Sequence, residues 1–180
     1  NADGNVTEFS VASDSDISSS FAHLAGVPNV QIARFTGPGI TDEGLEVLGG
    51  LTNIMRLDLT ASALGDPTLK VASNLKGIEV LLLRRTAVTD DGLAAIADLP
   101  KLRMIDLRNS NIADAGLDHL AKIKTLVDIQ LEKSKVTDTG VVKLKDLPLK
   151  SFNVNYCTAV SDESLIALGN ISTLEHLQMD

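Results

Sequence analysis

Apolar residues recur along the chain with a period of 24 positions. At each recurrence an apolar residue is followed by Thr or a similar residue, then Asp, any residue, usually Gly, and Leu. The anchors of this motif lie near residues 16, 40, 64, 88, 112, 136 and 160. A chain written as one repeating unit folds as a solenoid, in which each unit packs on its neighbours. We therefore expect a single repeat domain over residues 1–180.

Each repeat is expected to contain one helix and one short strand. After Val88, the apolar residues Leu93 and Ile96 follow at a spacing typical of one helix face. Further along the same repeat, Ile105 and Leu107 alternate with other residues, as in a strand with one buried side. Because these columns recur in every repeat, we predict parallel strands centred near residues 10, 34, 58, 82, 106, 130, 153 and 178.

An aspartate stands at the start of most predicted helices, where we expect it to cap the free amides of that helix. A calcium ladder is the weaker interpretation, because calcium needs six to eight oxygens around one ion. The glycines at 44, 92, 116 and 140 predict tight-packing positions, and the repeat at Leu64 lacks this glycine, so its helix should begin differently. The recurrent aspartates are Asp42, Asp66, Asp90, Asp114, Asp138 and Asp162.

The strand segments resemble leucine-rich repeats. Residues 78–86, 102–110 and 126–134 follow the signature Leu-x-x-Leu-x-Leu-x-x and then Asn, Thr, Ser or Cys. The added Thr-Asp-x-Gly-Leu resembles bacterial repeats of the ribonuclease-inhibitor-like or cysteine-containing type. This resemblance implies a right-handed α/β solenoid, with a parallel sheet of eight short strands on its concave face and helices on its convex face. It also implies binding to other proteins, and slightly favours an exported or cell-surface protein over a cytoplasmic one.

Arginine is concentrated on the outward side of the predicted strands, which we call the concave face. If Leu81 and Leu83 point into the core, Val80, Leu82 and Arg84 point outward. In this register four of the six arginines and none of the ten lysines face outward. The planar guanidinium suits docking to carboxylates, so this segregation favours a binding role. The outward arginines are Arg34, Arg56, Arg84 and Arg108, with Arg85 beside them.

Apolar side chains lie among these arginines, where a solvated sheet face is normally polar. Exposed apolar residues beside arginines are typical of the centre of an interface. We therefore predict a surface that binds an unidentified protein or peptide with acidic and apolar groups. Its predicted residues are Arg34, Arg56, Asp58, Val80, Leu82, Arg84, Arg85, Met104, Asp106, Arg108, Gln130 and Tyr156.

Two alternatives remain open at this point. The arginines could pair with acids of the same face, as in Asp58 with Arg84 or Asp106 with Arg108, and only neutralise it. The chain could also be a structural or spacer segment of a longer solenoid or multidomain protein. Asp180 follows the last predicted strand directly, so we expect an open C-terminal edge through which copies could associate.

Composition restricts the partners. A formal net charge of −8 disfavours unselective binding to nucleic acid, because the mean field repels phosphate. No run approaches eighteen apolar residues, so membrane insertion is not expected, and the N-terminus shows no charged and then apolar leader. The chain begins at Asn1, and we interpret Asn1 and Ala2 as a possible expression scar.

Catalysis and cofactors are not expected. His23 and His119 should lie far apart on the convex side as solvated surface residues, which argues against a shared metal site. His176 should face outward with no serine or cysteine nucleophile beside it. Cys157, the only cysteine, is expected to be buried and inert.

Overall fold

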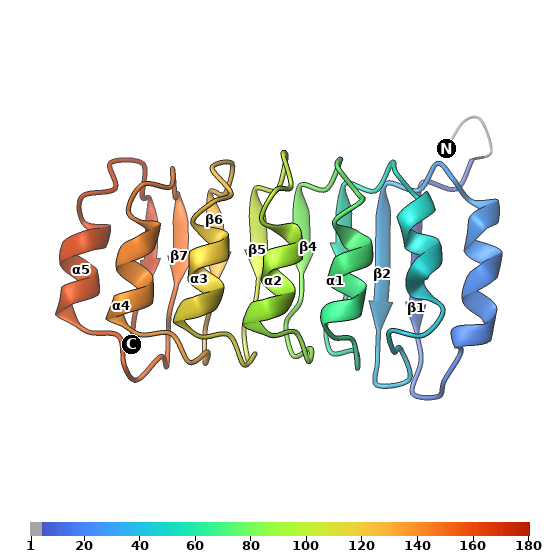
Figure 1. Ribbon diagram of the computed structural model, residues 1–180, viewed down its shortest axis with the longest axis horizontal. Helices are drawn as coiled ribbons and strands as arrows, with labels where there is room; N and C mark the ends of the chain where they lie inside the picture. Colours follow the sequence, from blue (N-terminus) through green and yellow to red (C-terminus); the bar gives the residue numbers. More distant parts are fainter. Residues whose placement is uncertain (1–4) are drawn as a thin grey trace.

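The computed structural model describes residues 5–180 as one row of repeats, with a single parallel sheet on one side and helices on the other (Figure 1). The two ends of the chain lie at opposite ends of the row. The strands follow chain order across the sheet from β1 to β8. They are β1 (Glu8–Ala12), β2 (Ile32–Thr36), β3 (Arg56–Asp58), β4 (Val80–Leu82), β5 (Met104–Asp106), β6 (Asp128–Gln130), β7 (Ser151–Asn153) and β8 (His176–Gln178).

The predicted strands and their register are confirmed. Each predicted centre falls inside an observed strand. Equivalent positions of successive repeats pair directly, as in Arg56 with Val80 and Val80 with Met104. The shift expected in the seventh strand is also present, because Phe152 in β7 and Val154 directly after it are the buried apolar residues.

The convex face carries helical structure in every repeat, as an α-helix from the third repeat onward, and in one repeat α4 continues directly into the 3-10 helix η3. The first two, η1 and η2, are 3-10 helices. In the second of them Gly44 adopts a left-handed backbone with a φ of 79° directly before the helix. The segments are η1 (Ser18–Gly26), η2 (Leu45–Gly50), α1 (Asp66–Ala72), α2 (Asp90–Ile96), α3 (Asp114–Leu120), α4 (Asp138–Val141), η3 (Val142–Leu144) and α5 (Asp162–Leu168).

The core lies between the sheet and the helices and runs through the repeats as one cluster. The inward leucines and isoleucines of the strands, such as Leu81 and Ile105, are fully buried together with the helix residues Leu93 and Leu117. Burying each such side chain contributes roughly 1.5–3 kcal/mol, so each repeat depends on the apolar surface of its neighbours.

The aspartates cap helices, but the predicted partner was wrong. Asp66 accepts hydrogen bonds from the Thr89 amide at 2.8 Å and the Thr89 hydroxyl at 2.7 Å, and Thr89 belongs to the next repeat. Asp114 holds Thr137 in the same way, with distances of 2.8 and 2.6 Å. Because neighbouring repeats stack side by side, the next helix start is closer to the carboxylate than its own. We call this series from Asp42 to Asp138 the carboxylate ladder.

The ladder explains the repeated glycines as tight-packing positions. A Cβ on Gly92 would lie 2.1 Å from Asp66 Oδ1, and a Cβ on Gly140 would lie 2.3 Å from Asp114 Oδ1. In the repeats that begin at Leu64 and Val160, which lack this glycine, the buried Thr68 and Ser164 donate a hydroxyl hydrogen bond to the preceding aspartate. This position of the repeat therefore accommodates either glycine, which has no side chain, or a residue whose hydroxyl donates to the carboxylate.

Acid should weaken one rung of the ladder in a defined pH range. The hydroxyl of Ser164 and then the amide and hydroxyl of Ser161 lower the pKa of Asp138 from 3.8 to about 2. A carboxylate with a lowered folded-state pKa stabilises the fold above its unfolded pKa and loses that contribution as pH falls from about 4 to about 2.

We expect the stability difference between the unaltered chain and Asp138→Asn to shrink over that pH interval, because the amide does not titrate. Urea unfolding at several pH values between 6 and 2 would measure it. A difference that stays constant down to pH 2 would show that the carboxylate charge contributes nothing to this rung.

No helix within residues 5–180 is long and apolar enough to cross a membrane. The predicted expression scar at Asn1 and Ala2 lies outside the described residues.

Candidate functional site

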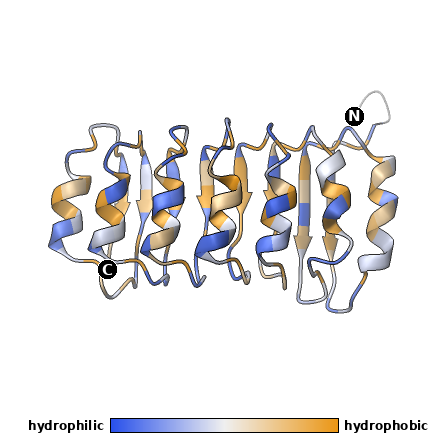
Figure 2. Cartoon of the chain, in the orientation of Figure 1, coloured by the Kyte–Doolittle hydropathy of each residue, from blue (hydrophilic) through white to orange (hydrophobic). Residues whose placement is uncertain are grey.

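The concave face brings the predicted site residues together on adjacent strands. Arg56, Val80 and Met104 form one row across β3, β4 and β5. In the next row Asp58, Leu82, Asp106 and Gln130 are register partners on β3 to β6. The apolar members of both rows are only half-buried. Figure 2 shows the hydrophobic colour of β4, which contrasts with the paler and bluer strands toward the C-terminal end.

Two of the four outward arginines are neutralised by acids of the same face. Arg34 donates to Glu8 on the neighbouring strand rather than to Asp58. Arg108 makes a two-pronged contact with Asp106, with Nε to Oδ1 at 2.9 Å and Nη2 to Oδ2 at 2.7 Å. Asp106 is buried, and its hydrogen bond raises the pKa of Arg108. The internal-pairing alternative therefore holds for Arg34 and Arg108.

The other arginines remain without such partners. Among residues 5–180, Arg56, Arg84 and Arg85 form no ion pair. The Nε of Arg84 is buried and has no hydrogen-bond partner in the described part of the chain. A buried donor without a partner is costly to the fold. Because this Nε is buried, an acceptor from another molecule would have to contact the accessible part of the half-buried Arg84 side chain. The suggested pair of Asp58 with Arg84 does not form, and Asp58 accepts the amide of Thr60 at 3.1 Å.

The C-terminal part of the concave face is polar and internally bonded. The side chain of Gln130 donates to Asp128 at 2.6 Å and to Ser151 at 3.2 Å. In the following turn, the Lys133 ammonium lies 5.1 Å from the ring centre of Tyr156. One acceptor of this part, the Oδ1 of Asn155, is nevertheless buried without a hydrogen-bond partner in the described chain. We define the central patch as Arg56, Val80, Leu82, Arg84 and Met104.

Two predicted residues lie beside the strands rather than on them. Arg85 and Tyr156 occupy the turns that follow β4 and β7, and both have a left-handed backbone with φ of 55° and 58°. Sequence analysis did not single out Lys133, which occupies the same turn position one repeat before Tyr156. Its offset from Arg85 by two repeats is the signal that would have found it.

The histidines are only partly where they were expected. His23 is exposed on η1, as predicted, but His119 on α3 is half-buried, and its Nδ1 is buried without a hydrogen-bond partner among the described residues. His176 is exposed on β8, yet the prediction that no serine lies beside it was wrong. Ser151 is its direct register partner on β7. The two are not hydrogen-bonded, and Glu175 pairs with Lys150 rather than with His176.

The environment of Cys157 agrees with its prediction. The thiol is buried and donates to the carbonyl oxygen of Leu131 at 3.2 Å. A free cysteine in such surroundings packs as a small hydrophobic residue.

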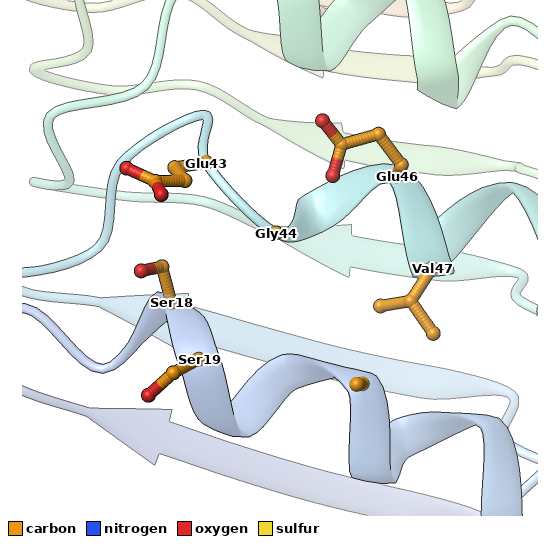
Figure 3. A pocket seen from close by; sticks show the side chains of 7 residues that line it. Ser18, Ser19, Glu43, Gly44, Glu46 and Val47 are labelled. Carbon is orange, nitrogen blue, oxygen red and sulfur yellow. The ribbon is translucent and has the colours of Figure 1, made fainter.

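A hollow lies on the opposite, convex face. It lies between η1 and η2 and is lined by serine hydroxyls and glutamate carboxylates, without a histidine or cysteine. Figure 3 shows Ser18 and Ser19 at the start of η1 and Glu43 in the loop before Gly44. Within residues 5–180, no group of three or more histidine, cysteine, aspartate or glutamate side chains is arranged to hold a metal ion.

The fold is that of a leucine-rich repeat α/β solenoid. Internalin C2 from Listeria monocytogenes superposes on 98% of this chain and 77% of its own, with a TM-score of 0.70 and 20% identity. Internalin F from the same organism matches 92% of this chain with a TM-score of 0.59 and 22% identity. The match covers 51% of internalin F, so this chain spans about half its length. No family model and no curated protein matches the sequence.

Proposed function

We propose that the protein is a non-catalytic interaction module that binds a protein or peptide on its concave face. The observation that carries this proposal is the central patch, where half-buried apolar side chains surround arginines with no acidic partner in the described chain. A partner carboxylate would receive the Arg84 guanidinium, and apolar groups would cover Val80, Leu82 and Met104. The broad row of strands suits a large partner surface better than a small molecule.

A double substitution tests this proposal. We expect Leu82→Ser with Arg84→Ser to reduce capture of a partner from the source cells by at least about tenfold, because it removes an apolar anchor and a charged donor together. Both side chains point away from the core, so the unfolding midpoint should change little. Quantitative affinity capture, with circular dichroism as the folding check, measures both effects.

The matched control removes one apolar and one cationic side chain from the convex face. Ile166 is 72% exposed on α5, and Lys145 is exposed after η3. Ile166→Ser with Lys145→Ser should leave partner capture unchanged. If instead the convex variant loses the partner and the concave variant keeps it, the proposed binding face is wrong.

A second candidate function is assembly through the last repeat. Leu165 is 41% exposed, whereas the equivalent Leu93 and Leu117 are fully buried. Leu177 on β8 is 36% exposed, and within residues 5–180 β8 pairs with β7 alone. Such a surface supports end-to-end association. Light scattering across a range of concentrations tests it, and a monomer at all concentrations would contradict it.

The finer assignment and the location also remain proposals. We infer repeats of the ribonuclease-inhibitor-like or cysteine-containing bacterial type from the Thr-Asp-x-Gly-Leu motif. We infer export or display at the cell surface from the same resemblance, and cell fractionation of the native source tests it.

A further inference from the structure

A row of turn residues, exposed except for the half-buried Asn109, borders the central patch. The residue three positions after the end of each strand from β3 to β7 has a left-handed backbone, and backbone hydrogen bonds join these turns from repeat to repeat. We call this row the turn ridge. Its residues are Ala61, Arg85, Asn109, Lys133 and Tyr156, with φ between 55° and 58°.

The residue types on the turn ridge are unfavourable for its backbone. Asparagine tolerates a left-handed conformation, but arginine, lysine and tyrosine do so at a cost. Tyr156 is 56% exposed, and the Lys133 side chain is 54% exposed. Lys133 contacts Tyr156 and lies 3.9 Å from Glu132, while Arg85 is exposed without an ion pair in the described chain. A smaller residue at these turn positions would therefore support the fold about as well as these long side chains do.

The turn ridge and the central patch together form a cationic and apolar surface. Arg84 and Arg85 are consecutive, so the unpaired guanidiniums of the patch continue directly onto the ridge. Lys133 places a further cation two repeats along the ridge, with its ammonium 3.9 Å from Glu132. The partner that complements this surface carries acidic groups beside an apolar stripe.

The spacing along the ridge selects the shape of that partner. Adjacent parallel strands lie about 4.8 Å apart, so Arg85 and Lys133, which are two repeats apart, stand about 10 Å apart along the row. An α-helix rises 1.5 Å per residue and brings positions i and i+7 to one side about 10.5 Å apart. An extended strand places same-side residues about 7 or 13 Å apart, which fits the ridge less well.

We propose that the concave face receives an amphipathic α-helix of a partner protein, which lies across the strands along the row of repeats. Its apolar stripe covers Val80, Leu82 and Met104, and acidic residues two turns apart contact Arg85 and Lys133. This inference rests on the proposed function, because it names the kind of partner that the same face binds.

Two synthetic peptides of about 18 residues and identical Leu, Glu, Ala and Gln composition test the shape. In one, leucines follow a helical stripe and glutamates flank it seven residues apart. In the other, leucine and glutamate alternate as in a strand. Titration monitored by fluorescence anisotropy should show at least about tenfold tighter binding of the helical peptide by the unaltered chain.

The ridge itself is tested with glycine, which adopts the left-handed backbone freely. Arg85→Gly with Lys133→Gly should weaken helical-peptide binding about tenfold, since two charge contacts are lost. The thermal midpoint should stay the same or rise, so the loss of binding is not a loss of folding. Ala61→Gly is the matched control at the same ridge position, and it should leave peptide binding unchanged.

Three results overturn the inference. Equal or tighter binding of the alternating peptide, removed by Leu82→Ser with Arg84→Ser, would refute the helix while supporting the concave face. Full affinity of the Arg85→Gly, Lys133→Gly variant would exclude the ridge from the site. If neither peptide binds at millimolar concentration, the helical partner is refuted, and partner capture by the concave variant still decides the proposed function separately.

Discussion

Asp42→Ala is expected to lower the free energy of unfolding by about 2–4 kcal/mol, the cost of leaving several helix-start donors without an acceptor. The Asp42 carboxylate receives the amides of Gly65 and Thr68, both at 3.1 Å, and the hydroxyl of Thr68. Thr68 is 1% exposed, so water does not replace the lost acceptor readily. Urea unfolding followed by circular dichroism measures the change.

Two further variants isolate the cause. Asp42→Asn keeps one oxygen acceptor and should cost less than the alanine variant. Glu43→Ala removes an exposed acid at the next position and should change stability by no more than about 0.5 kcal/mol. Equal stabilities of Asp42→Ala and Glu43→Ala would mean that the first rung of the carboxylate ladder does not couple its repeats.

The strands were predictable because their pattern is local and repeated. Alternate burial on either side of Leu81 fixes which residues face the core, and a fixed period carries that register to Ile105 and Leu57. The resemblance to leucine-rich repeats added the handedness and the side on which the helices lie. Fold class and the rows of the concave face follow from these two sources alone.

The partners of the aspartates in the carboxylate ladder could not be predicted from the sequence. The sequence places Asp66 at a helix start, where capping of its own helix is the ordinary expectation. Which helix receives the carboxylate depends on the lateral distance between stacked repeats, and no single repeat contains that distance. The hydroxyls of Thr68 and Ser164 in place of glycine carry the relevant signal, but they become interpretable only when the aspartate of the preceding repeat lies beside them.

The repeat pattern also does not predict which arginines form ion pairs within the chain. Arg84 and Arg108 occupy equivalent positions on adjacent strands. The residue two positions before Arg108 is Asp106, which pairs with it, and the residue two positions before Arg84 is Leu82. The same repeat position therefore holds a neutralised arginine in one repeat and an unpaired arginine in the next. The left-handed turn was likewise hidden, because Arg85 and Tyr156 are not residues that predict it.

Gly92→Ala should destabilise the protein by about 1–3 kcal/mol, although alanine is normally the better residue in a helix. Its Cβ would lie 2.1 Å from Asp66 Oδ1 and 2.6 Å from Asp66 Cγ. The carboxylate must then move away from the amide and hydroxyl of Thr89, which lie 2.8 and 2.7 Å from it. Chemical denaturation measures the loss.

Gly92→Ser should cost less than Gly92→Ala in spite of its larger side chain. A serine at this position can donate its hydroxyl to Asp66, as Ser164 does to Asp138. Gly50→Ala serves as the control, because a Cβ there would meet no atom within 4 Å, and its stability should change by no more than about 0.5 kcal/mol. If serine at position 92 is as destabilising as alanine, space alone governs the site. If it is milder, the donor requirement of the carboxylate ladder explains why glycine, serine and threonine share this position.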